Sequence, residues 1–517
     1  MFWADRVAHD LKKRKLPLEW VDDMKTPSGK IHVGALRGVV IQDLVYKALL
    51  DQKIKAKYTY IFDNHDPMDD LPVYLPKEKF EKYLGMPLYK IPSPEEGFEN
   101  YADYFAKDFI KVFEAIGCSP EILWSTDLYM SGKLNTVIKE CLDKADIIRD
   151  IYSKVYKKKL SDDWYPFQVY CPNCGKASTT KVNKWDGEFV YFKCRVDGVP
   201  WTKGCGFEGK TSPFSNRNGI TGKLVWKVEW ACKWKVIGVT VEGAGKDHMS
   251  RGGSHDIASL ICQKVINYPI PYPLPYEFFL VGGKKMSSSK GRGTSSSEML
   301  EILPAEILRF LMVKTRINQA INFDPSADTI PKLFDDYQEA SDAYFSAKGR
   351  SASGGKKTDR DLARIFELSQ VGKLGKPPKR RFSVLVQWVQ MPNLADRIRE
   401  EKLEEWAKYA KVWLERYAPD SAKFEIAQKI PIEVEKLNKK QKEYLKKIIQ
   451  ELDKKWEGED FQEKLYTLAK EEGLSSKEAF LAIYLSLIGK DSGPKAAWLI
   501  LEYKEFAQKR FQDVSSL

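Results

Sequence analysis

The first sixty residues alternate between short apolar runs and a glycine-containing turn, and this order restricts the fold more than any other part of the chain. Leu18–Val21 is typical of a strand, and a turn marked by Pro27 and Gly29 follows it. Apolar residues recur at helical spacing from Gly34 onward, and Tyr58–Phe62 predicts a second strand. Strand, turn, helix and strand in this order begin a parallel nucleotide-binding sheet, in which ligands bind beyond the carboxyl ends of the strands. The chain is therefore predicted to be an α/β protein.

A basic loop at Gly282–Gly293 is the second informative stretch. Its glycines flank four cations and three consecutive serines in the sequence GGKKMSSSKGRG. Glycine allows the backbone to approach a ligand closely, and ammonium groups with hydroxyls are suited to a polyphosphate. A solvated basic surface loop would have the same composition, so this loop does not decide the function alone.

Two short motifs together resemble the signatures of class I aminoacyl-tRNA synthetases. Lys285-Met-Ser-Ser-Ser289 is similar to their KMSKS signature, and His32-Val-Gly-Ala35, preceded by Pro27-Ser-Gly29, is similar to their HIGH signature. Two positions depart from the pattern: Ala35 replaces the last histidine of HIGH, and Ser288 replaces the second lysine of KMSKS, for which Lys290 is the candidate substitute. The resemblance implies catalytic roles for His32, Gly34, Lys285, Ser287, Ser289 and Lys290. It implies ATP binding by Pro27, Ser28, Gly29 and Met286.

A second glycine-rich corner is expected further along the chain. The stretch from Leu224 to Trp230 alternates in polarity and predicts a strand, after which glycines stand beside Asp and His at a predicted strand-to-helix transition. Such a corner suits a ribose and a base. The class I resemblance implies ATP binding by Asp247, Gly252, Gly253 and His255, and amino-acid binding by Trp230 and His248. Packing in the core is an equal alternative for Trp226, Trp230 and Trp234.

The end of the second predicted strand carries the acidic stretch Asp63-Asn-His-Asp66. In related synthetases an acidic residue at this place holds the α-ammonium group of the substrate, so Asp63 is the candidate for that role. For a lysine substrate, Asp66, Glu229 or Trp230 could contact the side-chain ammonium group. The alternative is that these residues merely cap the next turn.

Four of the eight cysteines cluster in the sequence. Cys171 and Cys174 form a Cys-x-x-Cys pair, and Cys194 and Cys205 complete a set of four thiolates that suits tetrahedral zinc. The segment from residue 165 to residue 209 has too little apolar content to fold alone, so metal binding would supply folding free energy. A redox Cys-x-x-Cys motif is the alternative, and the two further cysteines disfavour it. We therefore expect a structural Zn²⁺ ion and no catalytic metal.

The remainder of the chain is predicted to be helical. Gly349–Lys357 is linker-like, two apolar stripes with helical spacing follow, and Ser475–Glu478 forms a capping box. The class resemblance implies a bundle like those with which glutamyl- and class I lysyl-tRNA synthetases bind the anticodon. Exposed cations such as Lys379–Arg381 and the net charge of +12 suit a polyanionic partner.

No apolar stretch of the chain is long enough to span a bilayer, and no apolar run follows a basic start at the N-terminus. The protein is therefore expected to be cytoplasmic, without a membrane partner.

These observations together predict a Rossmann-like parallel-sheet catalytic domain with a zinc-binding insertion, followed by an all-α anticodon-binding domain. The predicted parts are residues 1–150 and 216–283 for the two halves of the catalytic domain, 151–215 for the insertion, 284–345 for the basic loop and stem-contact region, and 346–517 for the helical domain. The motifs most resemble archaeal-type class I lysyl-tRNA synthetases, which implies that L-lysine is activated with ATP and Mg²⁺ and transferred to tRNA(Lys). A glutamyl-type synthetase is the nearest alternative. A non-catalytic RNA-binding paralogue, favoured by Ala35 and Ser288, is another.

Overall fold

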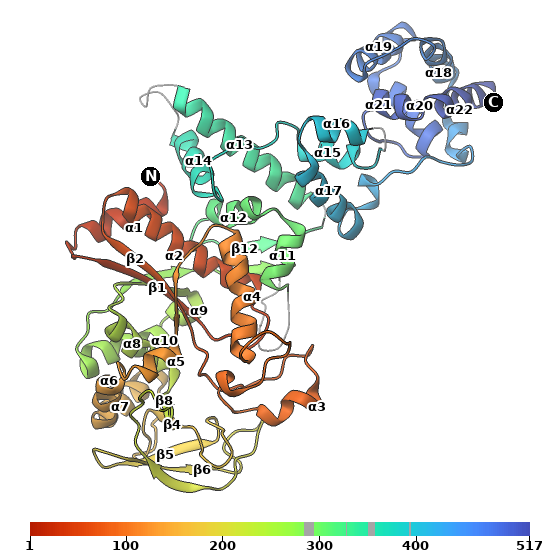
Figure 1. The fold of residues 1–517 in the computed structure, drawn as a ribbon. Coiled ribbons are helices and arrows are strands. Elements are labelled where there is room, and N and C mark those ends of the chain that lie inside the picture. The colour runs from red at the N-terminus through yellow and green to blue at the C-terminus, as the bar shows by residue number, and fades with distance from the viewer. Residues whose placement is uncertain (284–293, 327, 350–356, 392–393) are drawn as a thin grey trace. The chain divides into compact units, whose positions relative to one another are not determined.

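The computed structural model describes residues 1–283, 294–326, 328–349, 357–391 and 394–517 (Figure 1). The chain divides into two compact units. Unit 1 comprises Met1–Asp324 and Glu339–Gly375, and unit 2 comprises Pro325–Gln338 and Lys376–Leu517. Each unit is described separately below.

A five-stranded parallel sheet forms the centre of unit 1. Its strands are β1 (Glu19–Lys25), β2 (Ala56–Phe62), β3 (Glu121–Trp124), β9 (Val241–Gly245) and β10 (Tyr272–Tyr276), and they lie in the order β10-β9-β1-β2-β3. The strand order reverses between β1 and β9, because the chain builds outward from β1 first on one side and later on the other. This topology confirms the predicted Rossmann-like sheet, and the reversal is the point where such sheets bind ligands.

Helices cover both faces of this sheet. Helix α2 (Val33–Asp51) packs against β1, β2 and β9, and it is so close that a side chain at Gly38 would meet the Asp23 carboxylate. On the other face, α8 (Trp226–Ile237) reaches β9 through a hydrogen bond from Trp230 Nε1 to Glu242 Oε1. Successive side chains of a strand point to opposite faces. The neighbours Asp22 and Asp23 therefore face different helices.

The prediction of a strand at 224–230 was wrong. The strand β8 covers only Gly222–Leu224, and α8 begins two residues later at Trp226. Tryptophan and valine favour strands when only local propensity is considered, and a run this short cannot distinguish the two periods. In the structure, Trp230 and Trp234 are four residues apart on one helical face, and their burial against the sheet decides the conformation.

The cysteine-containing insertion lies between β3 and β9 in the chain. Strands β4 (Phe167–Val169) and β8 pair as an antiparallel ribbon, and β5 (Thr180–Trp185), β6 (Val190–Cys194) and β7 (Glu208–Thr211) form a three-stranded antiparallel sheet. Its apolar side chains, among them Val182 and Phe192, belong to the same buried cluster as Trp230. The insertion therefore shares the core of unit 1 instead of building a separate one.

The other helices of unit 1 surround these sheets. They are α1 (Trp3–Lys12), α3 (Lys77–Phe80), α4 (Tyr101–Ala115), α5 (Ser125–Met130), α6 (Asn135–Asp143), α7 (Ala145–Tyr156), α9 (Lys246–Met249), α10 (Ser254–Ile261), α11 (Ser296–Ile302), α12 (Ala305–Lys314) and α14 (Lys357–Leu368). A short parallel pair, β11 (Phe279–Val281) and β12 (Ile321–Phe323), completes the unit. The predicted helix ending before Gly117 is α4, and Gly117 has a φ of 77°.

A buried arginine connects the two ends of this unit in sequence. The Arg309 side chain on α12 pairs with Asp43 of α2 and donates to the carbonyl oxygens of Ile116 and Leu368. Its side chain is fully buried, and burial of a charge without partners is very costly. The pair therefore holds α12 against α2.

Unit 2 is helical, as predicted. Its helices are α15 (Phe382–Trp388), α16 (Ala395–Glu400), α17 (Glu404–Arg416), α18 (Lys439–Glu451), α19 (Gly458–Glu471), α20 (Ser476–Ile488), α21 (Ala496–Glu502) and α22 (Lys504–Ser516), and α13 (Thr329–Gly349) contributes its first part. The Ser475–Glu478 capping box is present at the start of α20. Among the helices of the described residues, none combines the length and apolar content that a bilayer crossing requires.

Candidate active site

The turn after β1 and the start of α2 form the first side of the site. Pro27 and Gly29 are buried in this turn, Ser28 is half-buried, and His32 stands at the N-cap position of α2. Two tyrosines hold the turn: Tyr101 Oη donates to the Ser28 carbonyl oxygen at 2.9 Å, and the Lys30 N–H donates to Tyr74 Oη at 2.5 Å. Gly34 lies in the first turn of α2. The free N–H groups and dipole of a helix N-terminus attract anions, so this end of α2 suits a phosphate.

The chain directly after the basic loop lies against this helix start. His32 and Ser295 form an antiparallel bridge, the Val33 N–H donates to the Thr294 carbonyl oxygen at 3.2 Å, and the Ser296 N–H donates to the Ile31 carbonyl oxygen at 2.9 Å. Five predicted site residues, Lys285, Met286, Ser287, Ser289 and Lys290, lie outside the described residues. The residues that follow them are joined by backbone hydrogen bonds to the predicted phosphate-binding turn.

The corner after β9 forms the second side. Asp247 lies on α9, and Gly252 and Gly253 connect α9 to α10, in whose first turn His255 lies. A Cβ atom at Gly253 would approach the His248 carbonyl oxygen to 2.3 Å, so only glycine fits there. Because β1 and β9 are neighbours, this corner and the first turn both lie at the strand-order reversal of the sheet. The structure thus brings the two predicted ATP-binding segments to one edge of the sheet.

Asp63 and Asp66 follow β2 at the same edge, and each is already bound to a lysine. Lys233 of α8 pairs with Asp63, which also accepts a hydrogen bond from Ser125 Oγ at 2.5 Å. Lys223 of β8 pairs with Asp66, to which Thr26 Oγ1 donates at 2.6 Å. Both lysine side chains are only 1% exposed. A substrate ammonium group bound to Asp63 or Asp66 would therefore share that carboxylate with the lysine already paired to it.

Glu229 is the centre of this network. Its carboxylate lies 2.9 Å from Lys223 Nζ and 3.6 Å from Lys233 Nζ, and it contacts His65 Nε2 at 2.6 Å. Tyr129 Oη donates to it at 2.5 Å. Burial by itself raises the pKa of Glu229, but the positive charges of His65 and the two lysines outweigh burial and hold the pKa well below its usual value. Glu229 is therefore ionised at neutral pH.

Trp230 lies in a cluster of aromatic rings beside this network. Its ring centroid is 5.1 Å from that of Trp234, and 6.1 Å from those of His248 and His255. Trp230 thus contacts both His248, the other predicted amino-acid residue, and His255, a predicted ATP residue. Burial lowers the pKa of His255, and Asp256 only partly opposes this effect.

Two further buried carboxyl groups lie on this face of the sheet. Asp22 of β1 is paired in register with Glu242 of β9, which accepts the hydrogen bond from Trp230. Burial raises the pKa of both groups well above the ordinary values, and the Asp22 carboxyl raises the pKa of Glu242 further. The pair therefore retains protons that exposed carboxyl groups would have lost, and it forms a largely uncharged floor under Trp230.

Sequence reasoning missed the two lysines, His65 and Tyr129. A helical interpretation of 226–237 would have placed Glu229 and Lys233 four residues apart on one face, which is the spacing of an ion pair. That signal was hidden because the stretch was predicted to be a strand. No local signal identifies Lys223 or Tyr129, since their partners lie 157 and 100 residues away.

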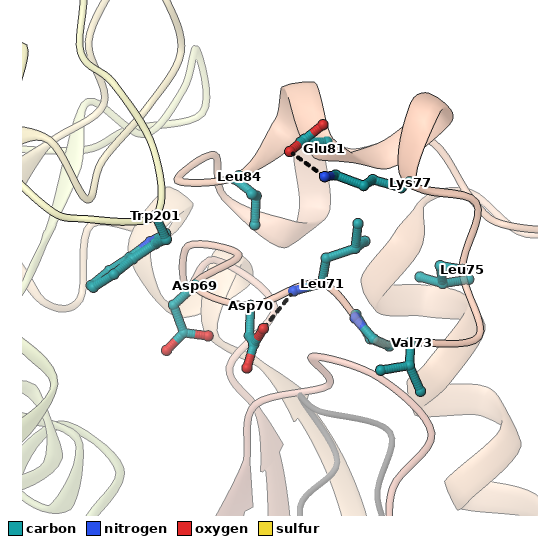
Figure 2. A pocket seen from close by; sticks show the side chains of 10 residues that line it. Asp69, Asp70, Leu71, Val73, Leu75, Lys77, Glu81, Leu84 and Trp201 are labelled. Atoms are coloured by element: carbon teal, nitrogen blue, oxygen red, sulfur yellow. Dashed lines mark hydrogen bonds and ion pairs between the residues drawn. The ribbon is translucent and has the colours of Figure 1, made fainter.

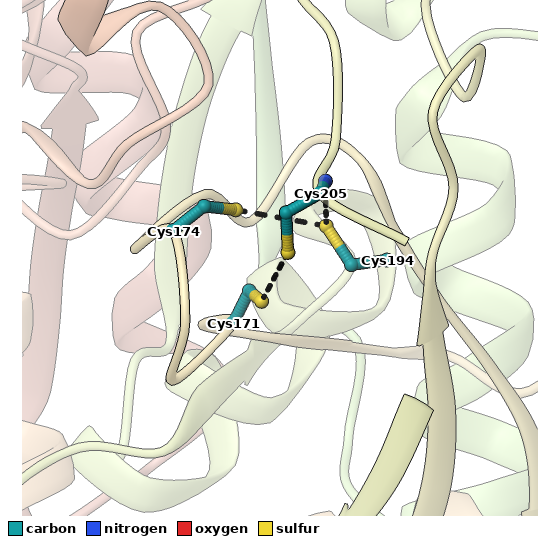
Figure 3. A group of neighbouring side chains, drawn as sticks. All are labelled: Cys171, Cys174, Cys194 and Cys205. Carbon is teal, nitrogen blue, oxygen red and sulfur yellow. Dashed lines mark hydrogen bonds between the residues drawn. The ribbon is translucent and has the colours of Figure 1, made fainter. Parts of the chain in front are cut away.

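The four clustered cysteines converge in the insertion (Figure 3). Cys171 Sγ lies 3.6 Å from Cys205 Sγ, Cys174 Sγ lies 3.6 Å from Cys194 Sγ, and all four sulfur atoms lie within 4.8 Å of one another. Four thiolates around zinc, at about 2.3 Å from the ion, are about 3.8 Å apart. The side chains therefore fit one tetrahedral metal ion. The other four cysteines are buried, as predicted for small apolar residues.

The fold and the edge described above define an α/β protein of the nucleotide-binding type, with a helix N-terminus and a glycine corner facing one ligand region. Residues 1–372 match the family described as tRNA synthetases class I (K), and the chain belongs to this family. The resemblance seen in the two short motifs is thereby confirmed.

Relatives match along the whole chain. The lysine–tRNA ligase 1 of Methanosarcina acetivorans is 34% identical, with 100% of this chain and 99% of the relative covered. The lysine–tRNA ligase of Archaeoglobus fulgidus is 33% identical, with 97% of each chain covered. The corresponding enzyme of Methanocaldococcus jannaschii is 34% identical, with 99% of each covered.

Proposed function

We propose that this protein is a lysine–tRNA ligase that activates L-lysine with ATP and transfers it to the 3′ end of tRNA(Lys). The observation that carries the proposal is the full-length similarity to proteins named lysine–tRNA ligase, together with the family match of residues 1–372. In the first step the lysine carboxylate attacks the α-phosphorus of ATP and displaces pyrophosphate. In the second step the terminal ribose of tRNA attacks the adenylate carbonyl and releases AMP.

The chain's own groups would align the anions. The main chain at Gly34 and the side chain of His32 are assigned to the phosphates, and Asp247, Gly252, Gly253 and His255 are assigned to the adenosine. Lys285, Ser287, Ser289 and Lys290 are assigned to the departing pyrophosphate, and Pro27, Ser28, Gly29 and Met286 to ATP. Support comes from the backbone bonds between residues 31–33 and residues 294–296, which join the residues directly after the basic loop to the start of α2. Mg²⁺ bound with ATP would neutralise phosphate charge.

The amino acid is assigned to the region of Asp63, Asp66, Trp230 and His248. The network around Glu229 contains three carboxylates, Asp63, Asp66 and Glu229, and two lysines, so it supplies more acceptors for a substrate ammonium group than lysines to pair with them. Trp230 offers an aromatic face, to which an ammonium group is attracted. These two features support lysine over glutamate.

The helical unit 2 is proposed to bind the anticodon arm of tRNA. Its surface carries lysines on α18 and α20, such as Lys440 and Lys477, and Tyr466 is 41% exposed beside Phe480. Lysines contribute sequence-independent attraction for phosphates, and an exposed aromatic ring can stack on an unpaired base.

Pyrophosphate exchange measured separately with each amino acid, in the presence of tRNA, tests the proposed function. Exchange that depends on lysine supports it, whereas exchange that depends on glutamate would favour the glutamyl-type alternative. Absence of exchange with every amino acid would favour the RNA-binding paralogue. Lys285→Ala should reduce the rate by about 100- to 1000-fold, which is the usual cost of removing one preorganised donor.

Cys171, Cys174, Cys194 and Cys205 are proposed to hold a structural Zn²⁺ ion. The variant Cys174→Ser should lower the zinc content of the purified protein, as measured by atomic emission, because three thiolates and a hydroxyl bind zinc less tightly. Cys262→Ser is the matched control, since Cys262 is buried away from the cluster. Equal zinc content in both variants would contradict the site.

A further inference from the structure

A pocket of about 420 Å³ lies beside the candidate active site, between the segment that follows Asp66 and the insertion (Figure 2). Its walls are mainly apolar and include Leu71, Leu75 and Leu84, and Trp201 of the insertion lies at its edge. Pockets for small ligands typically measure about 300–1,000 Å³. The size and the apolar lining therefore suit one flat organic group.

The pocket is attached to the candidate active site at two points. Asp69 lines it and follows Asp66 by three residues, so the two Cα atoms are at most about 11 Å apart. Tyr74 lies in the same segment and accepts the hydrogen bond from the Lys30 N–H in the turn before His32. The pocket and the candidate active site are therefore close enough for one extended molecule to contact both.

The cysteine-containing insertion forms the other wall. Trp201 precedes Cys205 by four residues, and the next residue, Thr202, donates from Oγ1 to the Leu84 carbonyl oxygen at 3.1 Å. This contact holds the insertion against the segment that carries the leucines. The Trp201 side chain remains 42% exposed, which is unusual for so large an apolar residue in a fixed loop. Its indole face is thus available to a ligand.

The polar groups of the pocket determine the chemistry of that ligand. Asp70 accepts a hydrogen bond from the Leu71 N–H at 3.0 Å, and Lys77 pairs with Glu81 at 3.4 Å, so these groups are engaged within the protein. Asp69 is exposed and presents a carboxylate acceptor. Because carboxylates outnumber the single lysine of the lining, a phosphate would be repelled from the pocket. A flat ring with an N–H₂ donor satisfies both the indole face and the carboxylate.

We propose that this pocket receives one unpaired nucleobase of the 3′ end of tRNA, stacked on Trp201 and donating its exocyclic amino group to Asp69. The proposal rests on the proposed function, which requires this end of tRNA to reach the active site. The three terminal nucleotides of a mature tRNA are two cytidines and an adenosine, and all three bases carry an exocyclic amino group. The phosphates of the strand would remain outside the pocket. Lys79, Lys82 and Lys203 are exposed and stand within two residues of the lining residues Lys77, Glu81 and Trp201 in the sequence.

Equilibrium binding of tRNA(Lys) transcripts tests the pocket without requiring catalysis. Trp201→Ala should weaken binding of the intact transcript by about 5- to 150-fold, which corresponds to the usual contribution of one base stacked on an aromatic ring. The same variant should bind a transcript that lacks the three terminal nucleotides as well as the wild type does. Val196→Ala, a change at an exposed apolar residue of the same insertion, is the matched control and should bind both transcripts normally.

A second experiment removes the amino group from the RNA. Replacement of the terminal adenosine by purine riboside, or of either cytidine by a pyrimidinone riboside, should weaken binding to the wild type at one position. At that position the replacement should have no further effect on Asp69→Ala, because the acceptor is already absent. Independent effects of the two changes, or equal losses of Trp201→Ala on intact and truncated tRNA, would overturn the proposal. The proposal would also be overturned if Asp69→Ala weakened the binding of an amine such as spermidine and left the binding of tRNA unchanged.

The two proposals can fail separately. If the wild type forms lysyl-tRNA but the variants bind intact tRNA normally, only the pocket is refuted. If the wild type forms no lysyl-tRNA, the proposed function fails, whatever the binding of the variants.

Discussion

Charged residues are used differently in the region beneath α8 and on the helices of unit 2. The pair of Lys233 with Asp63 is buried, with side-chain exposures of 1% and 14%, and it shares a network with Glu229. The pair of Lys446 with Glu443 on α18 has the same chemistry, but its side chains are 47% and 44% exposed. The two pairs differ in burial and not in chemistry, so a difference in their contributions to the free energy of unfolding would come from solvation.

The two pairs differ in what solvates a charge that has lost its partner. A charge on α18 that loses its partner is solvated by water, so an exposed pair contributes about 0–1 kcal/mol. A charge under α8 that loses its partner remains in a poorly solvated interior, and the cost is about 3–5 kcal/mol. Replacement of a whole buried pair by apolar residues can be neutral. Stability alone therefore does not require the network, and its distinctive property is its position at the edge of the sheet where Asp63 and Asp66 lie.

The largest effect is expected for Lys233→Ala. This change leaves Asp63 and Glu229 without one of their cations, and the free energy of unfolding around α8 should fall by about 3–5 kcal/mol. Hydrogen-exchange mass spectrometry during denaturation reads α8 and α18 separately and provides the measurement. A loss below 1 kcal/mol would show that water reaches the network, and the distinction between the two regions would then disappear.

A smaller effect is expected from the buried carboxyl group of Asp23 on β1. Burial raises the pKa of Asp23 to about 7 from an unfolded value of 3.8, although the Met24 N–H lowers it somewhat. The folded state therefore holds a proton that the unfolded state releases, so the unfolding free energy should fall as the pH rises from about 4 to 7. The contribution of this residue is at most about 4 kcal/mol.

The variant Asp23→Asn isolates this contribution, because asparagine has the same shape and does not titrate. Its unfolding free energy, measured by urea denaturation across the pH range, should fall less steeply between pH 4 and 7 than that of the wild type. Asp22 and Glu242 titrate in the same direction and remain in both proteins. Parallel pH profiles would mean that Asp23 is not the proton-binding group.

The smallest effect is expected on α18. Lys446→Ala should change the unfolding free energy of unit 2 by less than about 1 kcal/mol, because water replaces the lost partner of Glu443. The same hydrogen-exchange experiment measures it beside Lys233→Ala. Salt should reduce the effect further, since exposed charges are screened. A change as large as that at Lys233 would contradict the comparison.

The two regions also differ in how well their sequences predicted them. The helices of unit 2 were predicted from local periodicity, and residues of the predicted stripe such as Ile398, Leu403 and Trp406 are all buried. The capping box at Ser475 was recognised because its hydrogen bonds span only three residues. In contrast, the interpretation of 224–230 was wrong, because α8 is stabilised by burial of its tryptophans against a sheet that the local sequence does not show.

The sequence by itself determined the features whose partners are near in the chain. These are the turn before His32, the strand–helix–strand opening, the Cys-x-x-Cys pair and the caps, because bond geometry brings neighbours together in any fold that contains them. Only the tertiary structure decided that Lys223 meets Asp66, that Lys233 meets Asp63, and that the residues after position 293 lie against His32. Those partners are far apart in the chain, and only the packing of the whole core selects them from the many lysines and aspartates that could have paired.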